Sequence, residues 1–533
     1  MEDKTSIQLF RNDGEGYFVQ RVNRFEVKVR DIKAQSGIGK ASEELRRAEG
    51  DPIAETALVT YMPSRTASSP ERYLMNPQAS EPELSKDERT TTTRIEEAGG
   101  LKAKIVSAHC PNPGRLIELL YPDTRVILEA RMPNRSIEKI PFNQPEDGPT
   151  TEYDPNQVFN KEDDPYKGTS VKNNPKSSPT GVLDEKMKSS GKKASEKARE
   201  KATEKERKTL WTMVAVYAPS REKGCRERVV PLFASRMNRL TEELILPRLF
   251  PKARNIKREA RWGSSQFDFL VQDAEGNKHY VEVKGCTQVE YGIAMFPDAP
   301  SIRATRHLKE LAEVTKQGFQ AHLVLVFSHG PAERFIPNLH TDPLFAATLA
   351  ELSPPIQIHT AEIAADTAGQ AWVVQEGMPA DLSHGNLARE NRGSYLLSLY
   401  LKQKTELEIG ALGRLQLKTG WYVYAGSAQR GLSHRIARHL RKERKQFHWH
   451  IDYLSAVADK RIAYPIASYR NLECSLAQDL KSLGGVPIQG FGSSDCGCYS
   501  HLYFFPAESP PRDNPRFVQL LLWYRHREAF VIQ

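Results

Sequence analysis

Two long polar segments limit where this chain can build a hydrophobic core. The first, at about 34–99, runs through PSRTASSPER and SKDERTTTTR, and the second, at about 143–205, ends in EKAREKATEKER. Neither carries the apolar spacing of a core element, although Lys/Glu pairs in the second would support a solvated helix. We therefore expect both segments to be exposed insertions and the folded cores to come from the remaining sequence.

The length of the chain requires more than one core. Its 533 residues are enough for two or three domains with linkers. The six cysteines are sparse and scattered, which predicts reduced thiols and not a disulfide framework. The formal charge of +9 favours polyanionic partners without excluding an ordinary soluble protein.

The N-terminal residues and the hydropathy predict a cytoplasmic protein with no membrane partner. The opening MEDKTSIQLFRNDGEG lacks the apolar run of a secretory signal, and no stretch reaches the length that spans a bilayer. The sequence does not determine the oligomeric state.

Residues 1–230, without the two insertions, read as a small β-barrel. Four stretches alternate as strands do: FEVKV, AKIVSA, RVILEA and LWTMVAVY. From residue 231 the pattern changes to helix, paired strands, helix and strand, which predicts an α/β domain at 231–378. We expect a linker at 379–390, a third domain at 391–506 and a C-terminal tail at 507–533.

A carboxylate pair and a lysine stand out in the α/β domain. Strand alternation in QFDFLV puts Asp268 on the face opposite its phenylalanine neighbours. In YVEVKG it puts Glu282 and Lys284 on the same face of the following strand. A hairpin turn centred on Glu275 would set Asp268 opposite Glu282, where two carboxylates repel. A Mg²⁺ or Mn²⁺ ion would remove that repulsion, and Lys284 could orient a water or a phosphate. The alternative is a solvated hairpin face with ordinary surface charges.

Several arginines are candidates for contact with a nucleic-acid backbone. They come from a stretch before the first strand of the barrel, from the loop HCPNPGR and from a helix of the α/β domain, and they are Arg21, Arg24, Arg115, Arg303 and Arg306. A structural loop or a solvated helix face is the alternative explanation for each of them.

Four stretches of the first two domains resemble the sugar fermentation stimulation protein (SfsA) family: AHCPNPGRL, RWGSSQFDFLV, YVEVKGCT and MFPDAPSIRATRHLKEL. The resemblance implies an N-terminal OB-like β-barrel, an α/β PD-(D/E)xK nuclease-like domain, non-specific DNA binding and a regulatory role in sugar use. It maps the nuclease motif onto Asp268, Glu282 and Lys284, with Glu242 or Glu243 as a helix-borne acid.

The third domain resembles a GIY-YIG nuclease domain of α+β fold. GSYLLSLYL, GWYVYAGSA and GLSHRIARHL follow its strand, strand and helix order. HWHIDYL and GFGSSDCGCYSHL resemble a small GIY-YIG-like domain that is sometimes fused to endonuclease III. The resemblance implies catalytic roles for Tyr395, Tyr424 and Arg435, and a metal-binding role for Glu473. The motif words are loosened to GSY and YAG, and packing is the alternative role for these tyrosines and glycines.

A zinc site is a further candidate in this domain. Cys496, Cys498 and His501 lie at short spacing, as zinc ligands often do, and His448, His450 or Cys474 could join them. No second cysteine pair closes a four-ligand set, so the sequence favours reduced thiols in a packed loop.

Together these features favour a multidomain nucleic-acid-binding protein that hydrolyses phosphodiester bonds with a divalent metal. DNA is the expected partner, with RNA as the alternative. The competing hypothesis is a non-catalytic DNA-binding regulator of sugar (maltose) metabolism, in which the acidic face has no catalytic use.

Overall fold

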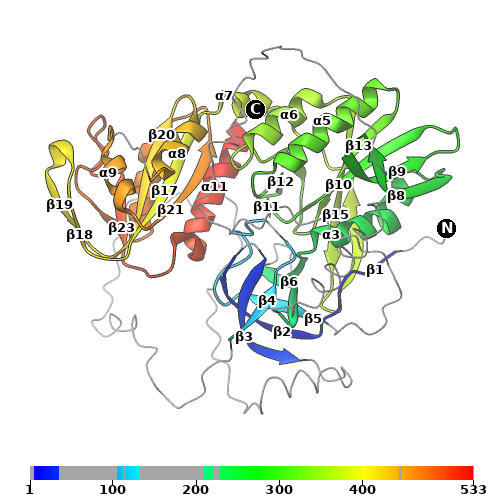
Figure 1. Cartoon of the computed structure of the whole chain (residues 1–533), viewed down its shortest axis with the longest axis horizontal. Helices are drawn as coiled ribbons and strands as arrows, with labels where there is room; N and C mark the ends of the chain where they lie inside the picture. The colour runs from blue at the N-terminus through cyan, green and yellow to red at the C-terminus, as the bar shows by residue number, and fades with distance from the viewer. Residues whose placement is uncertain are drawn as a thin grey trace, which may run out of the picture. The chain divides into compact units, whose positions relative to one another are not determined.

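The computed structural model describes residues 5–34, 105–131, 209–219, 227–442 and 447–531, apart from positions 24, 113 and 264. The first expected insertion beyond residue 34, all of the second, and Arg24 lie outside these residues. Figure 1 shows the described helices and strands in their order along the chain. No helix among them is both long and apolar enough to cross a membrane.

Five N-terminal strands pair into a closed ring, as expected for a small barrel. Four of their pairings are antiparallel, and a parallel pairing of β4 with β6, through Ala108 and Trp211, completes the ring β2-β3-β4-β6-β5. β2 was not among the strands expected from the sequence. The bounds of the strands are β2 Gly14–Arg21, β3 Glu26–Ala34, β4 Ile105–His109, β5 Arg125–Ala130 and β6 Trp211–Pro219. Their inward side chains, including Val27, Val29, Val126 and Met213, are fully buried.

The sheet does not stop at the expected domain boundary between residues 230 and 231. β7 (Glu227–Pro231) pairs with β6 and, through Val229 and Ala365, with β15, so the N-terminal strands continue into one thirteen-stranded sheet. Its second half runs in the order β15-β13-β10-β9-β8, with β16 and β1 attached beside β15. These strands are β15 Ile356–Ala365, β13 Gln320–Phe327, β10 Lys278–Cys286, β9 Ser265–Gln272, β8 Asn255–Trp262, β16 Gln370–Glu376 and β1 Ile7–Gln8.

Helices cover both faces of this half of the sheet, which is the expected α/β arrangement. One apolar cluster joins α3 (Ala234–Leu240), the π-helical turn Thr241–Ile245 and α4 (Leu246–Leu249) to one face of the strands. A second joins α5 (Ile302–Lys316) and α6 (Pro343–Leu352), neighbouring helices in Figure 1, to the other face. A side chain caps the start of each helix: Ser301 Oγ accepts from the Ala304 N–H, and Asp342 Oδ1 accepts from the Phe345 N–H. A small sheet of β11 (Val289–Glu290), β12 (Ile293–Phe296) and β14 (Arg334–Pro337) lies beside them.

The C-terminal domain is built on a five-stranded antiparallel sheet with the order β21-β17-β20-β23-β22. One apolar cluster packs α8 and α9 against it, and another packs α10 and α11. The strands are β17 Gly393–Leu401, β20 Gly420–Ala428, β21 Lys460–Ala467, β22 Val486–Pro487 and β23 Leu502–Phe505, and a hairpin of β18 (Thr405–Glu408) and β19 (Arg414–Leu417) stands beside them. The helices are α8 Leu432–Leu440, α9 His450–Val457, α10 Glu473–Ser482 and α11 Pro515–Val531.

Two segments expected to be a linker and a tail are helical and packed. Residues 385–390 of the expected linker form α7, whose Leu387 and Ala388 are buried with Met295 and Ile336. The expected tail holds α11, which buries Phe517, Val518 and Leu521 in the core of the C-terminal domain and lies along β21 in Figure 1. Their apolar residues are covered by segments distant in sequence, which local composition does not reveal.

Candidate functional site

The two carboxylates of the α/β domain come together through the register of β9 and β10. The pairing runs from Gln272 and Lys278 to Phe269 and Val281, and the same register brings Asp268 beside Glu282 as the next pair. The hairpin turn lies between Asp273 and Asn277, which is the turn expected from the sequence. The register prediction is therefore confirmed.

Glu282 is buried and held on one side only. Its side chain is 3% exposed, and its Oε1 contacts Lys284 Nζ and, at 2.5 Å, His307 Nδ1 on α5. Burial alone would raise the pKa of Glu282, but Lys284 and His307 lower it below its ordinary value, so the group is a carboxylate. Its Oε2 is buried and has no hydrogen-bond partner within the described part of the chain. A buried carboxylate oxygen without a partner is costly unless a ligand completes it.

Asp268 is oriented by two donors. Asn238 Nδ2 on α3 donates to Oδ1 at 2.7 Å, and the backbone N–H of Val283 donates to Oδ2 at 2.7 Å. Burial, and after it the charge of Glu282, raises the pKa of Asp268 to about 6. Each of its oxygens keeps a further lone pair for another donor or a cation. The pair is thus pre-arranged, at an electrostatic cost that a bound cation would remove.

The helix-borne acids implied by the family motif are engaged elsewhere. Glu242 is hydrogen-bonded to Arg258 Nε at 2.6 Å, and Glu243 pairs with Arg239 at 2.7 Å. The helical contact to Asp268 comes instead from Asn238, one turn earlier. The structure therefore gives Asn238 the place beside Asp268 that the motif reserves for an acid.

The basic residues singled out in the sequence do not form one group. Arg21 donates to the carbonyls of Asn112 and Gly114 and so holds the loop that carries Arg115. Arg303 and Arg306 lie exposed on α5, and Arg306 Nε is 3.6 Å from Glu310. Arg24 lies outside the described residues.

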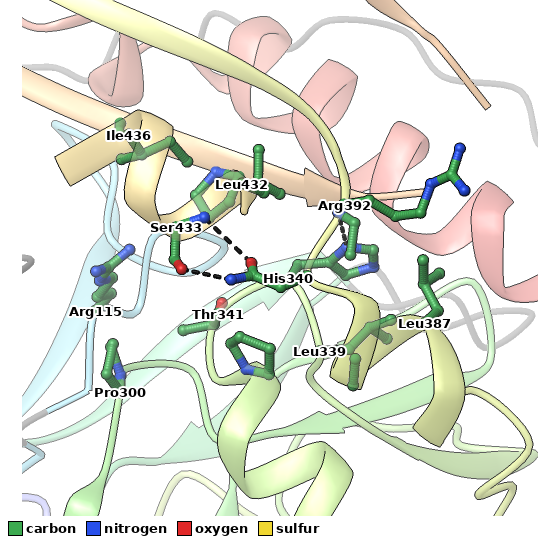
Figure 2. A pocket seen from close by; sticks show the side chains of 16 residues that line it. Arg115, Pro300, Leu339, His340, Thr341, Leu387, Arg392, Leu432, Ser433 and Ile436 are labelled. Carbon is green, nitrogen blue, oxygen red and sulfur yellow. Dashed lines mark hydrogen bonds between the residues drawn. The ribbon is translucent and has the colours of Figure 1, made fainter. Parts of the chain in front are cut away.

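Arg115 lines a pocket that is separate from the carboxylate pair. In Figure 2 it faces the pocket together with Pro300, His340 and residues at the start of α8, including Leu432 and Ile436. His340 accepts a hydrogen bond from the Ala467 N–H through Nδ1 and donates through Nε2 to the Arg525 carbonyl, so its ring is fixed. The pocket is mostly apolar and offers Arg115 as one of its few charged groups.

In the C-terminal domain Tyr395 opens a buried hydrogen-bonded chain. Its hydroxyl lies 2.9 Å from His439 Nε2, and His439 Nδ1 lies 3.1 Å from Asp452 Oδ1. Hydrogen bonds from His439, Arg438 and two backbone N–H groups outweigh burial and hold the pKa of Asp452 below its usual range, so this carboxylate only accepts. His439 therefore donates from Nδ1 to Asp452, and its Nε2 faces the Tyr395 hydroxyl.

Tyr424, Arg435 and Glu473, the other three residues implied by the GIY-YIG resemblance, lie around this series of hydrogen bonds. Burial raises the pKa of Tyr395 and Tyr424, and the charges of Arg435 and Glu473 act on both hydroxyls. Arg435 stacks 5.2 Å from the Trp449 ring centroid, and Glu473 accepts from Ser427 Oγ at 2.6 Å. Both tyrosines are under 10% exposed and protonated at neutral pH, so neither is a ready-made phenolate base.

Gly426 lets the two tyrosine rings approach β20. A Cβ at this position would lie 2.5 Å from Tyr395 Cζ and 2.7 Å from Tyr424 Cε1. We expect Gly426→Ala to lower the free energy of unfolding by about 1–3 kcal/mol, because the added Cβ would overlap two buried rings. Urea unfolding measures this, with Thr419→Ala as control because Thr419 is an exposed residue of the same domain. Equal stability of the two variants would contradict the tight packing.

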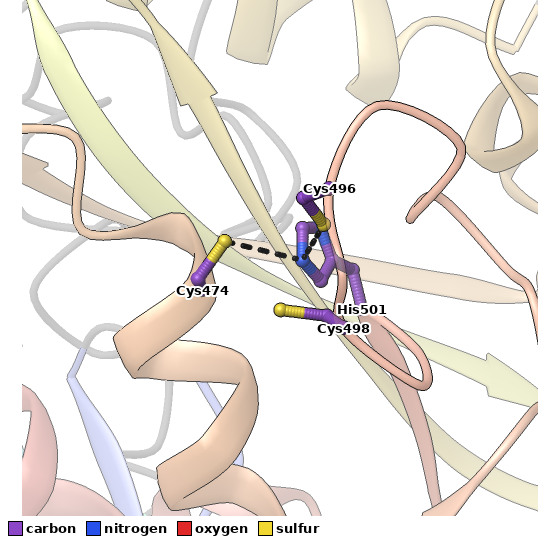
Figure 3. A group of neighbouring side chains, drawn as sticks. All are labelled: Cys474, Cys496, Cys498 and His501. Carbon is purple, nitrogen blue, oxygen red and sulfur yellow. Dashed lines mark hydrogen bonds between the residues drawn. The ribbon is translucent and has the colours of Figure 1, made fainter.

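Of the three further residues considered for zinc, the structure places Cys474 beside Cys496, Cys498 and His501. Cys474 lies on α10, whereas Cys496, Cys498 and His501 lie on the loop before β23, and Figure 3 shows the four side chains converging. Their ligand atoms all lie within 4.8 Å of one another. A second cysteine pair is thus not needed for a group of four, because a single cysteine from a separate helix supplies the fourth member.

Three positioning residues were missed in the sequence or assigned another role: Asn238, His307 and His439. A signal existed for two of them. His307 falls on the apolar face of α5 with Ala304, Leu308 and Leu311, and His439 is four residues after Arg435 on α8, on the same helix face. Asn238 reaches its partner only through a tertiary contact.

Three family models match the chain. The model described as the SfsA N-terminal OB domain matches residues 92–141, and the sugar fermentation stimulation protein RE domain matches residues 235–367. The domain of unknown function DUF123 matches residues 394–520. The first two fall within the expected barrel and α/β domain, and the third covers most of the expected third domain.

Curated relatives match the same central region. Sugar fermentation stimulation protein homologues from Thermotoga neapolitana, Clostridium perfringens and Methanosphaera stadtmanae are 43%, 36% and 40% identical over 140, 146 and 123 residues. The matches cover 26%, 27% and 22% of this chain and 57%, 60% and 51% of the relatives. The chain thus spans a little over half the length of these relatives.

One solved structure is also similar, the structure of Pyrococcus furiosus SfsA in complex with Ca²⁺. It is 16% identical, the match covers 70% of this chain and 99% of that chain, and the TM-score is 0.38.

Proposed function

We propose that this chain binds nucleic acid and hydrolyses its phosphodiester bonds. Models of both domains of the sugar fermentation stimulation protein family and of the DUF123 domain match it. The site would be the pair Asp268 and Glu282 with Lys284. The observation that carries the proposal is the buried Glu282 Oε2, which no described donor satisfies, beside a second carboxylate whose pKa is raised to about 6.

The donor set suits a hard divalent cation such as Mg²⁺ or Mn²⁺. Asp268 and Glu282 would hold the ion, because carboxylate oxygens are its preferred protein ligands. When bound, the ion would polarise a phosphate and lower the pKa of a water. Asn238 and the Val283 N–H fix Asp268, while His307 fixes Glu282 from the opposite helix. Lys284, 18% exposed, is the group available to orient water or phosphate.

DNA is the proposed partner, with RNA as the alternative. The net charge of +9 favours a polyanion, and the exposed Arg303 and Arg306 lie on α5, the helix that also carries His307 to the carboxylate pair. Contacts from such residues go to phosphates and carry no sequence information. We therefore expect binding that depends on salt and little on sequence.

The C-terminal domain is a second candidate site for the same chemistry. The chain from Tyr395 through His439 to Asp452 supports it, because a neutral histidine held by a carboxylate can take a proton from the hydroxyl. Arg435 would stabilise phosphate charge and Glu473 would hold a cation.

The test is cleavage of labelled single- and double-stranded DNA and RNA by the purified chain in Mg²⁺, Mn²⁺ or EDTA. Products that require a divalent cation support the proposal. If the protein shifts the labelled strands with salt-dependent affinity and forms no products, the hydrolytic proposal fails. The alternative, a non-catalytic DNA-binding regulator of sugar (maltose) metabolism, would then stand.

The pH dependence of metal binding follows from Asp268. Its pKa is about 6, above the ordinary value of 3.8, so the carboxylate gains a proton as the pH falls through 6. Because a proton and a cation compete for the group, we expect Mg²⁺ affinity to fall about tenfold per unit well below pH 6. Calorimetric titration at pH 7.5, 6 and 5 measures this. A constant affinity across the three would place the ion elsewhere.

A further inference from the structure

We infer that Cys474, Cys496, Cys498 and His501 bind one zinc ion that ties helix α10 to the loop 488–501 of the C-terminal domain. This inference does not rest on the proposed nuclease activity, because zinc binding is measured without any substrate.

The distances within the group fit a tetrahedral ion. His501 Nε2 lies 3.4 Å from Cys496 Sγ and 3.8 Å from Cys474 Sγ. In a tetrahedral site with zinc–ligand bonds of about 2.0–2.3 Å, neighbouring ligand atoms are separated by roughly 3.5–3.8 Å. All four ligand atoms lie within 4.8 Å of one another, so closing around an ion needs shifts of about 1 Å at most. Three thiolates and one imidazole are a complete ligand set for a structural zinc.

The orientation of His501 supports the same conclusion. Its Nδ1 lies 2.9 Å from Glu473 Oε1, and its Nε2 points at the sulfurs, as Figure 3 shows for the ring and the thiols. A metal-bound histidine usually donates its other ring N–H to a carboxylate, which fixes the ring and makes it a better ligand. The ring itself is buried, with an exposed fraction of 1%.

A zinc ion would add a crosslink to a loop that has little apolar core of its own. Between β22 and β23 the chain forms no helix or strand within its described residues, and its fully buried apolar side chain is Phe491. A metal that joins this loop to α10 supplies order that its small core does not. The ion would also help to orient Glu473, because one oxygen of that carboxylate contacts the ligand His501 and the other accepts from Ser427. Zinc is thus expected to position Glu473.

The first measurement is metal content. Full-length protein, expressed with zinc and purified under reductant without chelators, is expected to hold about one zinc per chain by mass spectrometry of the metals. Cys496→Ser with Cys498→Ser is expected to hold less than about a tenth of that, because two ligands do not retain zinc through purification. His501→Ala keeps every thiol and is also expected to lose most of the zinc. Cys110→Ser, a buried thiol of the N-terminal barrel, is the matched control and is expected to keep the full amount.

A second measurement does not depend on variants that could misfold. Co²⁺ exchanged into the wild-type chain is expected to give the intense visible bands of tetrahedral thiolate ligation. A wild type with no more zinc than the double variant, or a weak six-coordinate Co²⁺ spectrum, would overturn the inference. A disulfide between any two of the three cysteines in the protein as purified would overturn it too.

Discussion

Asp268→Asn is expected to reduce metal-dependent cleavage by about 10²–10³-fold or more, the effect of removing a group that stabilises charge in the transition state. The substitution keeps the shape of the side chain and removes the charge that would hold the cation beside Glu282. Binding to labelled DNA in EDTA is expected to change little, because the contacts to phosphate come from basic residues elsewhere. Single-turnover cleavage and gel-shift titration measure the two effects separately.

The matched control for this experiment is Asp273→Asn in the turn of the same hairpin. Asp273 accepts from Asn277 and lies 3.2 Å from His279, outside the carboxylate pair. Its loss is expected to leave the cleavage rate unchanged. Cleavage by Asp268→Asn within about threefold of the wild type would exclude the pair as the site. If Glu473→Gln then abolished cleavage, the activity would belong to the C-terminal domain.

The largest loss of stability is expected from Glu362→Ala, about 3–5 kcal/mol in the free energy of unfolding. Glu362 Oε1 pairs with Arg228 at 2.9 Å, and its Oε2 accepts from the Ala332 N–H at 3.0 Å. Both side chains of the pair are less than 10% exposed, so removing the carboxylate leaves a buried guanidinium without this counter-charge. The pair joins β7 to β15 where the two strands share one register pair, Val229 with Ala365.

A surface ion pair provides the comparison. Glu376 Oε2 lies 3.2 Å from Arg248, and both side chains are about one-third exposed. Glu376→Ala is expected to cost less than about 1 kcal/mol, because water and salt screen exposed pairs. Urea unfolding of both variants gives the two values. A loss below about 1 kcal/mol for Glu362→Ala would show that β7 and β15 are held together by other contacts.

Local patterns in the sequence predicted a large part of the α/β domain. The alternation of QFDFLV and YVEVKG, with the turn between them, gave the register of β9 and β10, and the apolar spacing gave α5 and β13. In the barrel, four strands were expected, β3 to β6, and they form two antiparallel pairings, β3 with β4 and β5 with β6. The parallel pairing of β4 with β6, which closes the ring, was not predicted. The resemblance to the SfsA family is confirmed by two domain matches, and the expected fusion agrees with the third.

Long-range packing accounts for what the sequence did not give. Packing between separate elements brings Asn238 beside Asp268 and Cys474 beside Cys496. The same holds for β7, which carries the sheet past the expected boundary, and for α11, which was expected as a tail.

By itself the sequence determined most elements of the α/β domain, the hairpin register and the residue types available for a metal site. Each of these depends on side-chain periodicity and turn length over a few neighbouring residues. The tertiary structure alone decided that Asn238 rather than a helical acid would lie beside Asp268, that Oε2 of Glu282 would be left without a described partner, and that a fourth ligand would complete the cysteine group. These outcomes depend on which distant surfaces bury one another, and the free energy of that burial is shared across the whole fold.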